Sequence, residues 1–335
     1  MSYWKIAAVL TAGLFTIEPA YAIIVVGGRT TTGVLDNSGT NKNPAPFNLA
    51  SFTGQHGSFL GTPIGPRHYV TATHIGGSPI TFQYANGGST VTSYSATRID
   101  YLDDLAIWKI ADTDPSFTHF IDIYTRNDEI GKQSISIGNG TLRGNPVNTP
   151  STSDLAGWEW GGGSTLQSWG TNTISSVVNL TVGSTQLGEF LALPFTRELD
   201  AQGNPINPDS GIFSGGDSGG PTFILDPLDN VWKLAAINGY VSVVSQTPNG
   251  PAYLASLFDA RGFYFGADLI TGSDPVPLES YATRISSRSE FILSYVAVPE
   301  PGSIALMAMA GLGAIACISW HYRRKKNLMN GAMVD

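Results

Sequence analysis

Along most of the chain, apolar and polar residues alternate over short stretches that end at glycine, proline or asparagine. Alternation with a period of two is typical of strands that bury one face, and the interrupting residues are typical of turns. The pattern therefore predicts an all-β body. The expected strands or strand pairs are 23–26, 69–74, 81–95, 105–110, 135–140, 173–182, 186–193 and 231–245, the last as a buried strand pair.

The composition agrees with this pattern and excludes some partners. Charged residues make up only 13%, against 39 glycines, which favours short strands and turns over long helices held by ion pairs. Cys317 is the one cysteine, so an internal disulfide cannot form. The formal net charge of -8 argues against a nucleic-acid partner, because phosphate binding needs clustered lysine and arginine.

The N-terminal residues 1–22 have the pattern of a signal peptide. Lys5 precedes an apolar run, and Ala20-Tyr21-Ala22 places small residues where signal peptidase reads them. We expect cleavage after Ala22, so that the mature chain begins at Ile23. The alternative, an uncleaved anchor, is disfavoured because the apolar run is short and ends at Glu18-Pro19.

The C-terminal end has three parts in order. Val298-Pro299-Glu300-Pro301 comes first, residues 304–320 are apolar, and Arg323-Arg324-Lys325-Lys326 follows. The apolar run is long enough to cross a membrane, and the cations would stay cytoplasmic, which leaves the body outside. We therefore predict a transmembrane helix at 304–320, with a buried core helix as the alternative.

This tail resembles the PEP-CTERM sorting signal of Gram-negative bacteria, over residues 298–327. The resemblance implies an exosortase-type sorting enzyme as a partner. It also implies an exported protein that is anchored in the inner membrane in transit and then delivered to the cell surface or extracellular matrix.

Three residues in the body are candidates for chemistry. Ser218 lies in Gly216-Asp217-Ser218-Gly219-Gly220-Pro221, where glycines let the backbone come close to a ligand. A serine needs a base to take its proton, and His74 lies at the end of an expected strand. Asp104 begins a buried strand and needs a partner there. Taken one at a time, His74 and Asp104 also fit structural roles.

The order His74, Asp104, Ser218 and the residues around each resemble the trypsin-like serine proteases of the chymotrypsin fold. Residues 70–74 (VTATH) are similar to the family's LTAAH, residues 104–107 (DLAI) to DIAL, and residues 216–221 are GDSGGP in full. The family has a cysteine after the histidine, whereas Ile75 stands here. The resemblance implies two antiparallel β-barrels, about 23–130 and 131–297, with the active site between them.

The same resemblance implies roles for individual residues. His74 is the general base, Asp104 orients it, and Ser218 is the nucleophile of a peptide-bond hydrolysis through an acyl-enzyme. The N-H groups of Gly216 and Ser218 form the oxyanion hole. Ile212 forms the floor of the substrate pocket, with Phe213 and Gly215 beside it, and the apolar floor argues against Lys/Arg specificity. Asp217 corresponds to the partner of the mature N-terminus, since residues 25–28 (VVGG) resemble the family's IVGG.

The sequence thus predicts an exported serine endopeptidase that acts on protein or peptide substrates and needs no cofactor. One alternative is a catalytically inactive binding or matrix protein with the protease fold. Another is an esterase, which the chain order of the three residues disfavours. No metal site is expected, because the remaining histidines are scattered: His56, His68, His119 and His321.

Overall fold

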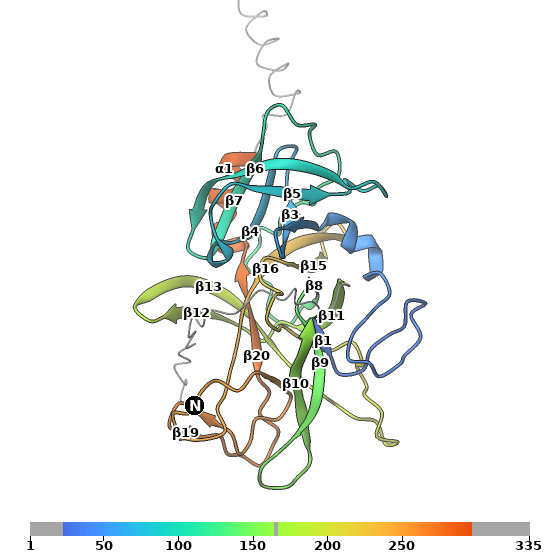
Figure 1. Ribbon diagram of the computed structural model, residues 1–335, viewed down its shortest axis with the longest axis vertical. Helices are drawn as coiled ribbons and strands as arrows, with labels where there is room; N and C mark the ends of the chain where they lie inside the picture. The colour runs from blue at the N-terminus through green and yellow to red at the C-terminus, as the bar shows by residue number, and fades with distance from the viewer. Residues whose placement is uncertain (1–22, 164–166, 297–335) are drawn as a thin grey trace, which may run out of the picture. The chain divides into compact units, whose positions relative to one another are not determined.

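The first half of the body forms a closed antiparallel barrel (Figure 1). The computed structural model describes residues 23–163 and 167–296. Around the barrel the strands follow the order β2 (Gly54–His56), β3 (Phe59–Pro63), β4 (His68–Ala72), β7 (Leu105–Ile110), β6 (Thr92–Leu102) and β5 (Ile80–Tyr84), and β5 pairs with β2 again. The aromatic residues of the alternating strands fill its interior, among them Tyr69, Phe82, Tyr94, Trp108 and Phe117.

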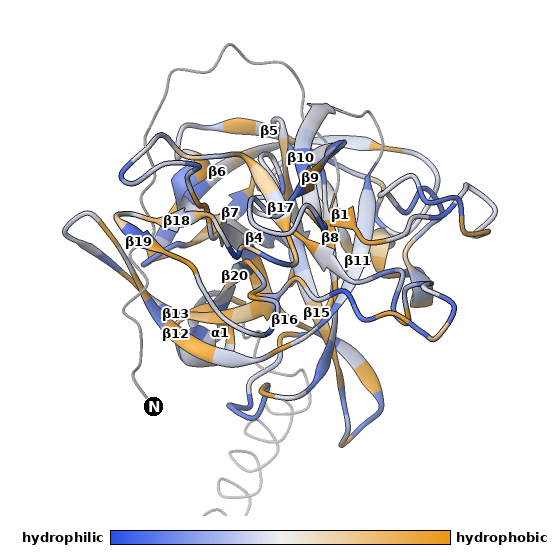
Figure 2. Ribbon diagram, turned by 90° about the horizontal axis from the view of Figure 1, so that it is seen from below, coloured by the Kyte–Doolittle hydropathy of each residue, from blue (hydrophilic) through white to orange (hydrophobic). Residues whose placement is uncertain are grey.

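The second half is a seven-stranded antiparallel sheet. Its strand order is β11 (Ser168–Thr173), β8 (Gln133–Gly138), β15 (Pro221–Asp226), β16 (Val231–Val241), β20 (Glu279–Arg284), β13 (Thr185–Pro194) and β12 (Ser176–Val182). In Figure 2, apolar segments of β16 and β20 lie among the central strands, while polar segments gather in the outer loops.

The two edge strands of this sheet, β11 and β12, are consecutive in the chain and are separated by Ile174 and Ser175 alone. Seven flat strands would hold the edges about 29 Å apart, whereas this link spans about 11 Å at most. The sheet must therefore curl. Asn172 Nδ2 donates to the Pro194 carbonyl oxygen across the approaching edges at 3.0 Å. The expected first barrel is closed, and the second is a curled sheet rather than a closed barrel.

Smaller elements complete the fold. A three-stranded sheet has the order β17 (Ala255–Leu257), β10 (Leu155–Gly163) and β9 (Thr141–Asn148), and two-stranded pairs are β1 (Ile24–Val25) with β14 (Gly211–Ile212) and β18 (Tyr264–Phe265) with β19 (Asp268–Leu269). The helical segments are 3-10 helices at Pro46–Phe52, Thr73–Ile75 and Ser286–Arg288, and the α-helix α1 at Ser289–Val296.

The all-β prediction is confirmed, with one difference in strand pairing. The expected strand pair at 231–245 is one strand, β16, because its hairpin partner is β15, which precedes it. The expected transmembrane helix at 304–320 and the signal peptide at 1–22 lie outside the described residues. Within the described ranges, none of the helices is long and apolar enough to cross a membrane.

Candidate active site

His74 and Asp104 lie at the same end of two paired barrel strands. His74 is in the 3-10 helix that follows β4, and Asp104 directly precedes β7, whose Leu105 is the partner of Ala72 in β4. The Nδ1 of His74 is 2.9 Å from each oxygen of the Asp104 carboxylate, which also accepts the His74 backbone N-H at 3.1 Å. Since the carboxylate is a pure acceptor, Nδ1 carries the proton and Nε2 is left to accept.

Ser218 completes this set from the second half of the chain. Its Oγ is 2.8 Å from His74 Nε2 and 3.3 Å from the Gly239 carbonyl oxygen. The single hydroxyl proton can go to only one acceptor at a time, and the shorter distance favours the imidazole. A hydroxyl, a base and a carboxylate that orients the base are thus connected by hydrogen bonds.

The two adjacent acids at the start of β7 have different partners. Asp104 is 2% exposed and faces His74, whereas Asp103 forms an ion pair with Arg288 at 2.8 Å. The backbone of Asp103 is in the left-handed region, with φ of 54°, which turns its side chain away from that of its neighbour. The predicted choice of Asp104 as the orienting carboxylate agrees with this geometry.

The turn at 214–220 has three backbone N-H groups without a protein acceptor among the described residues. Asp217, Gly219 and Gly220 donate their N-H groups to protein carbonyls. The groups without an acceptor within residues 23–163 and 167–296 are those of Gly215, Gly216 and Ser218. Gly216 and Ser218 are the two predicted for an oxyanion hole, and Gly216 has a φ of 102° that favours glycine.

Asp217 is buried behind this turn and is 1% exposed. Its carboxylate accepts the N-H groups of Gly140 at 2.6 Å and Ser214 at 2.7 Å. Burial raises its pKa to about 7, against the opposing effect of these hydrogen bonds. The Ile23 side chain lies near it, because a Cβ built on Gly138 would overlap Asp217 Oδ1 and lie 3.0 Å from Ile23 Cδ1.

Tyr240 is a residue of the site that the sequence did not point to. Its ring centroid lies 4.9 Å from that of His74. Burial, and then the nearby Asp104 charge, raise the pKa of the Tyr240 hydroxyl above its usual value. Tyr240 follows Gly239, where the register of β16 shifts against β20. In the sequence it appears only as one more apolar position of a buried strand.

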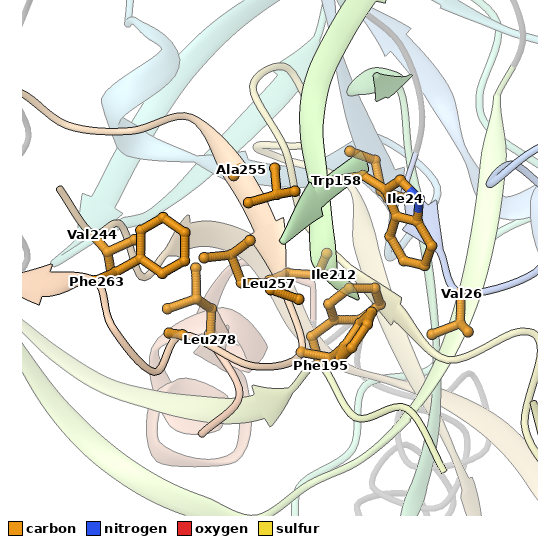
Figure 3. Close-up of a cluster of buried hydrophobic side chains, with 14 residues drawn as sticks. Ile24, Val26, Trp158, Phe195, Ile212, Val244, Ala255, Leu257, Phe263 and Leu278 are labelled. Carbon is orange, nitrogen blue, oxygen red and sulfur yellow. The ribbon is translucent and has the colours of Figure 1, made fainter. Parts of the chain in front are cut away.

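The predicted substrate residues Ile212 and Phe213 are core residues, which corrects that expectation. They are 0% and 4% exposed. Figure 3 shows Ile212 in a hydrophobic cluster with Phe195 and Leu257. The pairing of β14 with β1 directs Ile212 into this core, so a substrate cannot reach it. The reason for excluding Lys/Arg specificity therefore disappears.

Gly215 is the one predicted substrate residue that is partly exposed. The Trp160 ring borders it, 3.6 Å from where a Cβ on Gly215 would lie, and is held by a hydrogen bond from Nε1 to Ser256 Oγ at 3.1 Å. An aromatic side chain from β10, that of Trp160, thus borders the nucleophile turn at Gly215.

Two of the other histidines in the described ranges, His56 and His119, have aromatic packing partners, and His68 lies in β4. His56 is 3% exposed, lies 3.0 Å from the Tyr69 hydroxyl through Nδ1, and has its pKa lowered to about 4 by burial. His119 stacks on Phe52. Among residues 23–163 and 167–296, no three His, Cys, Asp or Glu side chains are grouped as metal ligands.

Comparison with known proteins identifies the C-terminal tail. Residues 297–325 match the PEP-CTERM protein-sorting motif, which confirms the sorting signal predicted at 298–327. The motif indicates an exported protein that an exosortase-type enzyme processes and that is sorted to the cell envelope or surface. A search of curated proteins finds no match.

Solved structures similar to this chain include two from the serine protease group. The MamO protease domain from Magnetospirillum magneticum is 16% identical over 84% of this chain and 97% of its own, with a TM-score of 0.37. Neuropsin, a serine protease of mouse brain, is 12% identical over 76% of this chain and 98% of its own, with a TM-score of 0.43. Both similarities are too distant to assign an activity.

Proposed function

We propose that the chain is an exported serine endopeptidase that hydrolyses peptide bonds through an acyl-enzyme. The observation that carries this proposal is the connected set of His74 Nε2 at 2.8 Å from Ser218 Oγ and His74 Nδ1 at 2.9 Å from Asp104. Base and nucleophile are within direct proton-transfer distance, and a buried carboxylate orients the base.

In the proposed reaction, His74 Nε2 takes the Ser218 proton as Oγ attacks the scissile carbonyl carbon. The imidazolium that forms is stabilised by the Asp104 carboxylate and then donates the proton to the leaving amine. Water, activated by the same imidazole, hydrolyses the acyl-enzyme. The tetrahedral oxyanion would accept hydrogen bonds from the N-H groups of Gly216 and Ser218, which have no competing acceptor among the described residues.

The N-terminus of the mature chain has a proposed place in the site. Cleavage after Ala22 would create an amine at Ile23, whose side chain lies beside the Asp217 carboxylate. A cation there would stabilise the charged form of a carboxylate whose pKa burial raises to about 7. This supports Asp217 as the partner of the new amine, without removal of a further propeptide.

The proposed route of the chain combines both ends. Signal peptidase removes residues 1–22, the predicted helix at 304–320 holds the chain in the inner membrane of a Gram-negative cell, and the sorting enzyme acts on the matched motif. The body at 23–297 is then released to the surface or matrix, where it meets protein or peptide substrates.

A serine-directed phosphonate tests the activity. We expect the exported full chain to be labelled, and Ser218→Ala to abolish the labelling, because only an activated hydroxyl attacks phosphorus. Asp104→Asn should lower kcat by about 10⁴, since the amide can donate to Nδ1 and hold the imidazole in the wrong tautomer.

A matched control is Ser175→Ala, a serine of the short link between β11 and β12 that lies outside the proposed set. Its labelling should persist where the chain folds. Absence of labelling of the wild-type chain at every pH would contradict the proposal and favour a binding or matrix protein with this fold.

A further inference from the structure

Arg288 contacts the turn that carries Asp104 and is itself almost completely buried. Its side chain is 2% exposed, and its Nη2 lies 2.8 Å from Asp103 Oδ2. Asp103 directly precedes Asp104 in the turn between β6 and β7. Because one peptide unit joins the two acids, a displacement of Asp103 is transmitted to the backbone of Asp104.

The guanidinium of Arg288 is also fixed to the second half of the chain. Nη2 donates to the Leu187 carbonyl oxygen, and Nη1 donates to those of Glu189 and Arg284, each at 2.9 Å. These carbonyls belong to β13 and to the end of β20. Arg288 is therefore held rigidly by the curled sheet while it holds a turn of the barrel.

Gly188 shows how closely these parts approach one another. A Cβ built there would overlap both Arg288 Nη2 and Asp103 Oδ2, and the φ of 76° favours glycine as well. The β12–β13 hairpin thus lies directly against the ion pair, whose Arg288 side chain is 2% exposed while that of Asp103 is 36% exposed. Because the cation is buried, solvent screens this pair less than it would screen two exposed side chains.

Electrostatics favour the same arrangement. Burial lowers the pKa of Arg288, and Asp103, Asp104 and Glu189 act against that shift. The buried cation thus faces three carboxylates, of which Asp103 is its direct partner. Without Asp103, the buried guanidinium would be hydrogen-bonded to uncharged acceptors alone, and the turn between β6 and β7 would no longer be fixed to the curled sheet through this ion pair.

We propose that Arg288 is a positioning residue that, through Asp103, holds Asp104 in line with His74. This inference rests on the proposed serine protease function. The base comes from the barrel and the nucleophile from the other half, so distances of 2.8–2.9 Å survive only if both halves keep their relative placement at the turn. Arg288 connects the two halves beside Asp104, the carboxylate that orients His74.

The test is Asp103→Asn in the full chain, because asparagine tolerates the left-handed backbone and removes only the ion pair. With kcat expressed per active site titrated by a phosphonate, we expect about a tenfold decrease and a KM within about twofold of wild type. The matched control is Asp100→Asn, which removes the charge from the β6 acceptor of the Tyr295 hydroxyl but leaves Asp103 and Arg288 paired. Its kcat should stay within about twofold of wild type.

A second measurement does not depend on activity. In a Ser218→Ala background, the NMR signal of the His74 Nδ1 proton reports its hydrogen bond to Asp104. We expect Asp103→Asn, and Arg288→Lys as a second variant, to broaden or remove this signal while Asp100→Asn retains it. An unchanged signal and an unchanged kcat in Asp103→Asn would overturn the positioning role. Absence of Ser218-dependent labelling in wild type would instead contradict the proposed function and leave the NMR comparison decisive for Arg288.

Discussion

At the scale of single residues, the environment of Asp104 decides what the proposed site can do. The carboxylate is 2% exposed and receives hydrogen bonds from the His74 ring and backbone, and the Tyr240 hydroxyl lies near enough to feel its charge. Several donors stabilise a buried carboxylate in its charged form and limit its rotation. A fixed, charged Asp104 in turn keeps the His74 proton on Nδ1, which leaves Nε2 for Ser218.

Tyr240→Phe tests the hydroxyl near Asp104. The ring should remain against His74 while the polar group near the carboxylate is lost. We expect kcat to fall by up to about tenfold, as for the loss of a polar interaction with a charged group. The matched control is Tyr281→Phe. Tyr281 lies in the same hydrophobic cluster as Tyr240, but its hydroxyl is hydrogen-bonded to Ser242 and Glu279. Equal kcat values for the two variants would contradict a role for the Tyr240 hydroxyl.

Residues in short motifs could be predicted, and residues that act from a neighbouring strand could not. His74, Asp104 and Ser218 each lie in a recognisable run of residue types, and the structure brings the three together. Tyr240 reaches His74 because β16 shifts register at Gly239, and no local pattern marks such a shift. Ile212 was misplaced for a similar reason, because its burial depends on pairing with β1, far away in the sequence.

At the scale of elements, the nucleophile turn is shaped by its contact with the barrel. A Cβ on Gly219 would overlap Thr71 Oγ1 of β4 and lie 2.5 Å from the Leu60 carbonyl oxygen of β3. Its N-H donates to the Asn238 carbonyl oxygen at 2.9 Å, which holds the turn on β16. The turn is thus confined between the two halves, and this contact sets how near Ser218 comes to His74.

Gly219→Ala should therefore displace the turn. The left-handed backbone alone costs about 1–2 kcal/mol in the free energy of unfolding, and the clash with β3 and β4 should raise the total to about 3 kcal/mol or more. Gly203→Ala is the matched control, because its φ of 83° is close to the 81° of Gly219 while nothing lies within 4 Å of its Cβ. Denaturant unfolding and kcat of both variants measure the difference, which should appear as a larger loss of both in Gly219→Ala. A similar loss of stability in the two would show that close packing against the barrel is unimportant.

Local alternation predicted nine of the twenty strands in the described ranges, but it did not predict most of their partners. Residues 231–245 were expected to fold back on themselves, yet β16 pairs with β15 and β20 instead. Apolar runs show that a strand is buried without showing which neighbour buries it. The curl of the second sheet could not be predicted from local alternation either. It depends on the short link between β11 and β12, which lie at opposite edges of the sheet.

At the scale of the whole molecule, the effect of Asp217 on stability is expected to depend on cleavage of the N-terminal residues. The sorting motif could be predicted because its three parts occur in a fixed order in one short segment. The start of the mature chain at Ile23 stays a prediction, while the proximity of the Ile23 side chain to Asp217 depends on the folded chain and has no local pattern. A buried carboxylate with a pKa near 7 is unfavourable in its charged form, so its stability contribution depends on whether a cation reaches it.

The last prediction concerns the pH dependence of folding. In a chain that keeps residues 1–22, folded Asp217 has a pKa of about 7, against 3.8 for the unfolded group. Below about pH 4 both states are protonated and nothing is lost. Between about pH 4 and pH 7 the unfolded carboxyl ionises while the folded one keeps its proton, so the free energy of unfolding falls by about 4 kcal/mol as pH rises.

Asp217→Asn should remove this fall. In the exported chain that begins at Ile23, the new amine should also remove it by pairing with the carboxylate. Urea unfolding at pH 4 and pH 7.5 separates these cases: an equal fall in the exported and the extended chains would exclude the amine as partner, and a fall that survives Asp217→Asn would assign it to another group.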